Sequence, residues 1–159
     1  FYRDRLTPYH PSREDWTKEG NLRLLELPNF ADLSMPSADP YGRDRDQWPL
    51  FRTESAGALM RHVDGFVGYC GAAGVEPFLC FYLHPWEFCE MPQGELRVGE
   101  GTVRPDPFIV KNCGPYAAAQ LEALIAALQA RGGRFYQARQ VADEWRVRED
   151  AARRQTGGG

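Results

Sequence analysis

The chain alternates short apolar runs with longer segments whose apolar residues recur at helical spacing. The clearest apolar run is residues 78–83, which leads directly into a His-Pro-Trp-Glu turn. A short run without charged residues is typical of a strand that is covered on both faces, as in parallel sheets. Because Pro85 cannot donate a hydrogen bond to a sheet, we expect this strand to end at His84.

Two further strands and three helices complete the predicted pattern. Residues 22–27 and 134–136 are the other strand candidates. Apolar residues recur every three or four positions over 51–70 and 115–131, and a shorter stripe covers 138–148. The predicted order is therefore strand, helix, strand, helix, strand, helix.

Two long connections, at 29–50 and 89–113, are rich in proline and glycine. Connections of this length inside a compact domain are usually lids or binding loops, or else disordered. Alternating strands and helices favour an α/β fold with a parallel sheet. Since a closed barrel typically has about eight strands, the pattern predicts a partial (β/α) barrel with two long loops.

Length and composition fit one domain followed by a short tail. The chain has 159 residues, enough for one core, and its 43% hydrophobic and 26% charged residues are ordinary for a globular protein. We assign residues 1–150 to the domain and expect residues 151–159, which end in three glycines, to be a disordered tail. The first residue is Phe1 rather than Met, so the sequence leaves the cellular compartment open.

Charge, hydropathy and cysteine spacing limit the classes of function. The formal net charge of −3, with no basic stripe before the last residues, gives no indication of nucleic-acid binding. No apolar run approaches the roughly 20 residues that cross a bilayer. The cysteines at positions 70, 80, 89 and 113 include no C-x-x-C pair, and their spacing neither requires nor excludes disulfides.

The turn after residues 78–83 holds the candidate chemistry. Loops at the carboxyl ends of strands build the active sites of α/β folds. His84, Trp86 and Glu87 would bring an imidazole, an indole and a carboxylate to such a loop. Glu26, near the end of its own predicted strand, could face the same site. The simpler alternative makes His84 a loop residue bonded to a carbonyl group and Glu26 a solvated charge on an edge strand.

Three blocks of the chain resemble the polysaccharide deacetylase family, whose members carry the chitooligosaccharide-deacetylase homology domain. Pro-Tyr-His-Pro-Ser at 8–12, followed by the leucine-rich 24–28, resembles the mid-domain Arg-Pro region and the strand after it. Tyr-Leu-His-Pro-Trp-Glu at 82–87 resembles the late Leu-x-His motif. Residues 121–145 resemble the closing helix, strand and helix, and the resemblance covers most of residues 5–145.

The resemblance implies the C-terminal half of a hydrolase that removes acetyl groups from an N-acetylated polysaccharide or oligosaccharide. Such enzymes hold a divalent metal, commonly zinc, that polarises the amide carbonyl and activates water, while an Asp acts as general base. His84 matches the late histidine, which protonates the leaving amine. Leu83 matches the leucine that shapes the acetyl pocket. Tyr9 and His10, together with Glu26, Trp86 and Glu87, complete the expected substrate-binding residues.

The chain departs from the family at the metal site. The family's early Asp pair and its His-x-x-x-His ligands precede the region present here; this chain has only His10, His62 and His84, and no Asp-Asp pair. Because zinc needs at least three protein ligands, we expect the chain alone to bind no zinc tightly. Leu6 stands where the family's arginine is expected, with Arg5 beside it, so the residue that orients the base stays open.

Two alternatives stand beside the deacetylase hypothesis, which assigns enzymatic activity through resemblance alone. One is a non-catalytic carbohydrate-binding or interaction module, because aromatic residues make up 13% of the chain and three tryptophans lie on or near loops: Trp16, Trp48 and Trp86. The other gives His84, Glu87 and Cys89 a metal of their own. Their spacing does not enforce the defined geometry that metal selectivity requires.

Overall fold

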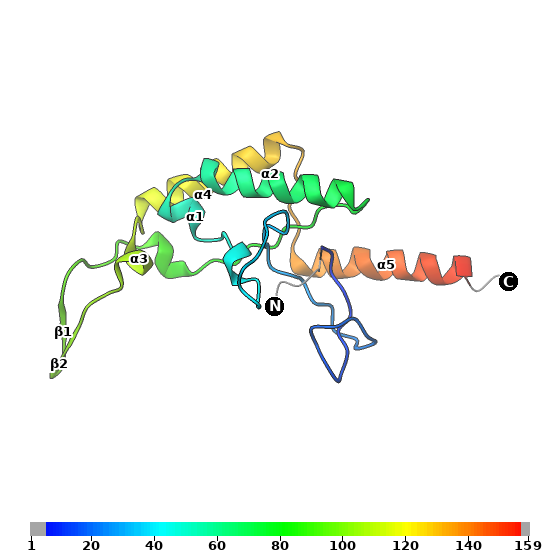
Figure 1. Ribbon diagram of the computed structural model, residues 1–159, viewed down its shortest axis with the longest axis horizontal. Helices are drawn as coiled ribbons and strands as arrows, with labels where there is room; N and C mark the ends of the chain where they lie inside the picture. Colours follow the sequence, from blue (N-terminus) through cyan, green and yellow to red (C-terminus); the bar gives the residue numbers. More distant parts are fainter. Residues whose placement is uncertain (1–5, 157–159) are drawn as a thin grey trace. The chain divides into compact units, whose positions relative to one another are not determined.

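The computed structural model describes residues 6–156. The helices and strands in chain order are η1 (Arg43–Arg45), α1 (Leu50–Thr53), α2 (Ala56–Ala72), η2 (Pro85–Phe88), β1 (Leu96–Val98), β2 (Gly101–Val103), α3 (Pro107–Val110), α4 (Pro115–Ala130) and α5 (Ala138–Thr156) (Figure 1). The chain divides into two compact units, Phe1–Leu128 and Gln129–Gly159.

The three predicted helices are confirmed as α2, α4 and α5. Helix α2 begins after Ser55, whose hydroxyl accepts a hydrogen bond from the Ala58 N–H at 3.1 Å, as expected of an N-cap. Helix α4 begins with Pro115, whose missing N–H costs nothing at that position. Helix α5 continues to Thr156, so residues 151–156 of the predicted tail are helical; residues 157–159 lie outside the described residues.

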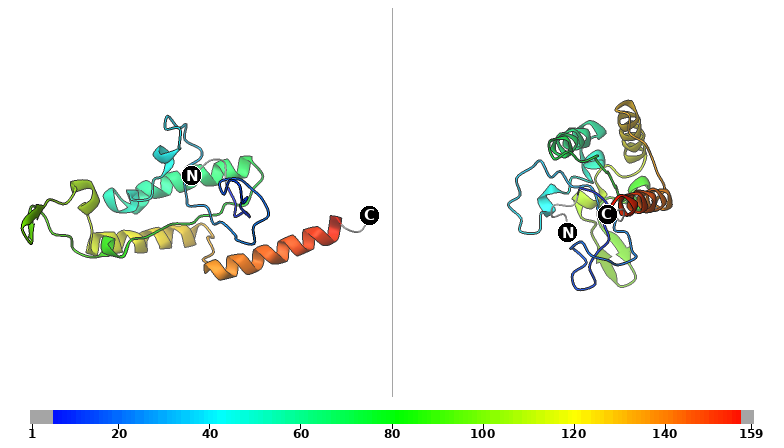
Figure 2. Two further views of the ribbon diagram at one scale, coloured as in Figure 1. Left: turned by 90° about the horizontal axis from the view of Figure 1, so that it is seen from below. Right: turned by 90° about the vertical axis from the view of Figure 1, so that its right-hand side faces the viewer.

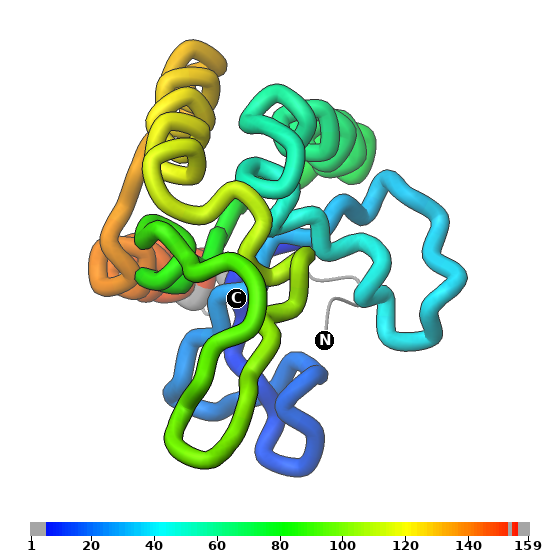
Figure 3. Tube along the Cα trace, turned by 90° about the vertical axis from the view of Figure 1, so that its left-hand side faces the viewer, coloured from blue at the N-terminus to red at the C-terminus, as the bar shows by residue number. Residues whose placement is uncertain are grey.

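The core of the first unit lies where α1, α2 and α4 meet the 29–50 connection. Helices α2 and α4 lie side by side (Figures 1 and 3). Phe30 packs edge-on against Phe66 of α2 at 5.5 Å, and Trp48 stacks on Phe51 at 4.6 Å. The core comprises Phe30, Ala31, Leu33, Trp48, Phe51, Ala56, Leu59, Met60, Val63, Phe66, Cys70, Ala117, Leu124 and Leu128.

The structure corrects the secondary structure expected at the three strand candidates. Within residues 6–156 the ladder that forms is the antiparallel hairpin of β1 and β2. Residues 78–83 make one backbone hydrogen bond, from the Phe30 N–H to the Cys80 carbonyl at 2.8 Å. Residues 22–27 make a bridge between Glu26 and Tyr9 and a hydrogen bond from the Leu22 N–H to the Pro11 carbonyl at 3.1 Å, which together do not form a ladder. An extended segment becomes a strand only beside a second backbone edge. The partial (β/α) barrel stays a prediction.

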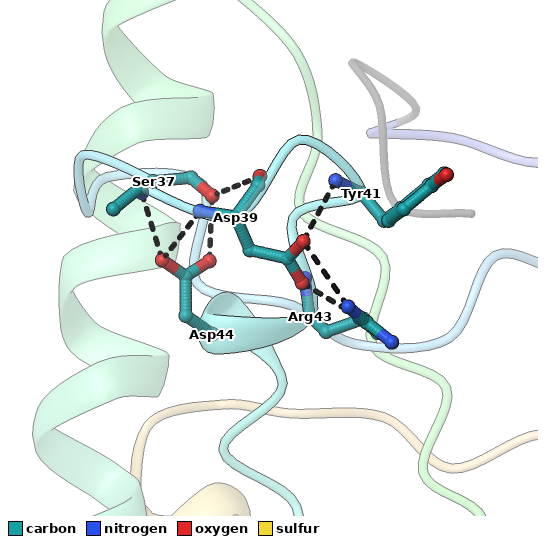
Figure 4. A network of polar contacts seen from close by, with 6 residues as sticks. Ser37, Asp39, Tyr41, Arg43 and Asp44 are labelled. Carbon is teal, nitrogen blue, oxygen red and sulfur yellow. Dashed lines mark hydrogen bonds and ion pairs between the residues drawn. The ribbon is translucent and has the colours of Figure 1, made fainter.

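The 29–50 connection is ordered by two carboxylates (Figure 4). Asp44 accepts a hydrogen bond from the Ser37 hydroxyl at 2.6 Å, and Asp39 accepts one from the Arg43 Nε at 2.7 Å and one from the Tyr41 N–H at 3.1 Å. The side-chain bond from Arg43 is the main cause that lowers the pKa of Asp39 from 3.8 to about 2. This part of the connection is therefore a folded turn rather than a disordered lid.

The 89–113 connection contains the β1–β2 hairpin and the short helix α3. Leu96 faces Val103 across the hairpin, and Val98 faces Gly101. Figure 3 shows this hairpin extending away from helices α2 and α4. Because hairpins form from contacts close in sequence, the predicted long loop acquires structure of its own.

Candidate functional site

His84 lies on the surface where the extended residues 78–83 end, although the strand expected there does not form and none of residues 78–83 is buried. Its ring stacks on Trp86 with centroids 5.3 Å apart and an angle of 15° between the planes. The ring of Tyr82 meets it edge-on at 5.7 Å. These aromatic contacts limit the orientations of the imidazole while leaving it open to solvent.

Residues 84–88, which we name the His84 turn, are closed by hydrogen bonds between His84 and Glu87. The His84 N–H donates to Oε2 of Glu87 at 3.0 Å, and the Glu87 N–H donates to the His84 carbonyl at 2.9 Å. Pro85 begins η2, where its missing N–H is tolerated. The Pro-Trp-Glu sequence therefore determines the local conformation from which the imidazole projects.

A buried ion pair anchors this turn from inside. Nε of Arg52 lies 3.2 Å from Oε1 of Glu87, and both side chains are 2% exposed. Arg52 also donates to the carbonyl groups of Ile109 and Lys111, and its guanidinium lies 5.5 Å from the centre of the Trp86 ring. A buried charge pair persists only when its remaining polar atoms are satisfied, as these are. The arrangement joins α1, η2 and α3.

Arg52 is the important residue that sequence reasoning missed. It lies within the segment 51–70, where the pattern indicates only an amphipathic helix, and its partner Glu87 is 35 residues away. The sequence places Glu87 among the substrate-binding residues, but the structure places its carboxylate in the interior, bonded to Arg52 and His84. These contacts make Glu87 a residue that holds the His84 turn.

Tyr82 and Leu83 supply exposed surface beside the imidazole. The Tyr82 hydroxyl donates to Oδ2 of Asp46 at 3.2 Å. Burial, followed by the charge of Asp46, raises the pKa of Tyr82 to about 12, so the phenol is a hydrogen-bond donor at neutral pH. Leu83 is 44% exposed and adds an apolar side chain next to His84.

Tyr9, His10 and Glu26 meet in a second group. Tyr9 and Glu26 exchange backbone hydrogen bonds at 3.2 and 2.8 Å, and Nδ1 of His10 lies 2.8 Å from the Leu24 carbonyl. We name residues 9–26 the N-terminal hairpin; it and the His84 turn lie apart in Figures 1 and 2. Two causes raise the pKa of the Cys80 thiol: burial, which is the larger, and the negative charge of Glu26. Cys80 belongs to the extended segment that leads to His84.

The described residues include no group of three or more His, Cys, Asp or Glu side chains that could hold a metal. Of the three histidines, His10 faces a backbone carbonyl and His84 stacks on Trp86, whereas Nδ1 of His62 lies 2.8 Å from Oδ2 of the buried Asp32. In the alternative in which His84, Glu87 and Cys89 bind a metal, the metal would have to displace Arg52 from the Glu87 carboxylate.

The tryptophans proposed for sugar stacking differ in exposure. Trp48 lies on the 29–50 connection, but it is 2% exposed and stacks on Phe51, so its ring packs the connection against the core and is not available for sugar stacking. Trp16 is 61% exposed, and Trp86 is half-buried between these extremes. Trp48 is buried because the 29–50 connection folds back over the core, an arrangement that its sequence does not indicate.

No family model matches the chain, and no significant match was found among curated proteins or solved structures. Within residues 6–156, no helix combines the length and the hydropathy that crossing a membrane requires. The deacetylase hypothesis therefore depends on the residues quoted above and on the geometry of the His84 turn.

Proposed function

We propose that the chain is the C-terminal part of a metal-dependent polysaccharide deacetylase and that His84 is its general acid. The observation that supports this most is the exposed imidazole of His84, stacked on Trp86 above the buried Arg52–Glu87 pair. A general acid must be open to substrate yet restricted in orientation, and the turn provides both properties.

The imidazole suits the protonation of a leaving amine. An imidazole can give up a proton when the amide C–N bond breaks and regain one from water afterwards, as a general acid must. Tyr82, whose hydroxyl is bonded to Asp46, supplies its ring, and Leu83 supplies an apolar side chain that an acetyl methyl group could contact at the same surface. Trp86 acts as a positioning residue because its ring contacts both His84 and Arg52.

The catalytic metal would supply carbonyl polarisation and an activated water molecule. The described residues do not fit such a metal, so the role proposed for this chain is limited to proton donation and substrate contact. The proposal therefore requires an Asp-Asp pair and a His-x-x-x-His sequence in the reading frame upstream of Phe1. An upstream sequence without them would contradict it.

The activity test uses the protein produced from the complete reading frame and an N-acetylated chitooligosaccharide. We expect His84→Ala to lower kcat by roughly 10²–10⁴-fold, the usual contribution of a general acid, while substrate binding changes only a few-fold. The matched control is His62→Gln, because His62 lies on α2 and pairs with Asp32 away from the His84 turn. Equal activity of His84→Ala and the unchanged protein would refute the assigned role.

One observation favours the second candidate, a non-catalytic carbohydrate-binding module. Trp16 is exposed, and the His84–Trp86 ring pair borders an exposed tyrosine and leucine. Aromatic surfaces of this kind stack on the apolar faces of sugars. This candidate predicts that Trp86→Ala abolishes oligosaccharide binding and that no hydrolysis occurs with any form of the protein, including the complete reading frame.

A further inference from the structure

Two cysteines flank the 90–112 segment, which contains β1, β2 and α3. Cys89 directly follows η2, and Cys113 lies just before α4. Both are free thiols in the structure; Cys89 is exposed and Cys113 is half-buried. Both thiols can therefore be reached by reagents in solution, whereas the thiol of the core residue Cys70 cannot.

The backbone brings the two ends of this segment into contact. The Gly114 N–H donates to the Glu87 carbonyl at 2.9 Å. A Cβ atom at Gly114 would lie 3.2 Å from the Glu90 nitrogen and 3.3 Å from its Cα, so residue 114 touches residue 90 directly. Each of the two cysteines is the chain neighbour of one residue in that contact. A disulfide requires Cα atoms roughly 4.4–6.8 Å apart, a spacing that adjoining segments supply.

Each of the two thiols contacts the backbone carbonyl group four residues before it. Sγ of Cys89 lies 3.8 Å from the Pro85 carbonyl, and Sγ of Cys113 lies 3.6 Å from the Ile109 carbonyl. Burial is the main cause that raises the pKa of the Cys113 thiol; Arg52 lowers this pKa, and the charges of Glu87 and, least of all, Cys89 raise it.

We propose that Cys89 and Cys113 are a disulfide-forming pair that closes the 90–112 segment. The oxidant is a small-molecule disulfide. The Cys89 thiolate, after losing its proton to solvent, attacks one sulfur of the oxidant and releases one small thiolate. Cys113 then attacks the mixed disulfide, forms the Cys89–Cys113 bond and releases the second small thiolate. Two protein thiols are oxidised, and the oxidant is reduced to two thiols.

The disulfide would act on stability and on the His84 turn. A cross-link between positions 89 and 113 restricts the unfolded chain more than it restricts the folded one, because these segments already touch. It would also hold the end of η2, where the Cys89 N–H donates to the Trp86 carbonyl at 3.1 Å. The inference is independent of the proposed deacetylase function.

The test exposes residues 1–159 to a series of oxidised and reduced glutathione ratios. The protein is then denatured, its free thiols are alkylated, and a non-reducing digest is analysed by mass spectrometry. We expect two of the four cysteines to become protected and to be recovered as one Cys89–Cys113 peptide. Oxidation should raise Tm by roughly 5–10 °C, and dithiothreitol should reverse the change.

Variants make the result specific to this pair. Cys89→Ala and Cys113→Ala should each abolish both the linked peptide and the shift in Tm, whereas Cys80→Ala, at another half-buried cysteine, should retain them. Four alkylatable thiols, counted after the oxidised protein is denatured, would overturn the proposal. A cross-link that involves Cys70 or Cys80 instead would overturn it equally.

Discussion

Single residues in this protein take roles that their neighbours in sequence do not reveal. Glu87 belongs to a polar turn, yet its carboxylate is buried against Arg52. Removing one partner of such a pair leaves an uncompensated charge, which typically costs about 3–5 kcal/mol. Asp39 differs from Glu87, because its hydrogen bond with Arg43 lies at the surface of the 29–50 connection and not in the interior.

The Asp39 network makes a prediction about acid pH. Hydrogen bonds from Arg43 and Tyr41 lower the pKa of Asp39 from 3.8 to about 2 in the folded protein. Its stabilising contribution is therefore complete above the ordinary carboxyl pKa and is lost as pH falls from about 4 to about 2. We expect the amide signals of Tyr41 and Arg43 in NMR spectra to titrate with a midpoint near 2.

Asp39→Asn is the control for that titration, because it removes the ionisable group while keeping a similar shape. The midpoint should disappear from both amide signals in this variant. If the two amide signals of the protein without this substitution titrate near the ordinary value of 3.8, the contacts of Asp39 with Arg43 and Tyr41 do not persist in solution.

At the scale of elements, helix α2 shows how the surroundings decide the effect of a substitution. Gly65 and Gly68 both lie inside this helix, where glycine costs about 1 kcal/mol relative to alanine. A Cβ at Gly68 would meet no atom within 4 Å. A Cβ at Gly65 would lie 2.8 Å from the Ser34 Oγ, which is itself hydrogen-bonded to Asp32.

We therefore expect Gly68→Ala to raise the free energy of unfolding by about 0.5–1 kcal/mol. Gly65→Ala should be less stable than Gly68→Ala, because the added methyl group displaces the Ser34 hydroxyl. Urea unfolding followed by circular dichroism measures both values. Combining Gly65→Ala with Ser34→Ala should relieve the clash; an equal gain for the two single variants would contradict this packing.

At the scale of the whole molecule, the described histidines and carboxylates do not converge on one place. His10, His62 and His84 contact the Leu24 carbonyl, Asp32 and Trp86 respectively. We expect isothermal titration of residues 1–159 with Zn²⁺ to detect no site with a Kd tighter than about 1 μM, because coordination would require breaking these contacts.

One tight zinc site per chain would contradict this expectation, and the variant His84→Ala would locate it. If that variant lost the site, the metal would lie at the His84 turn, as in the alternative that combines His84 with Glu87 and Cys89. If it retained the site, other ligands would have to be sought, and the limited role proposed for this chain would need revision.

Local patterns in the sequence were sufficient for the helices and for the turn that begins at His84. The stripes of α2 and α4 and the proline after His84 act over a few residues, so no tertiary information is needed to interpret them. Tertiary structure alone decided the burial of Trp48, the Arg52–Glu87 pair and the contact beside Cys89 and Cys113. It also decided strand pairing, because an extended segment needs a second backbone edge that its own sequence cannot specify.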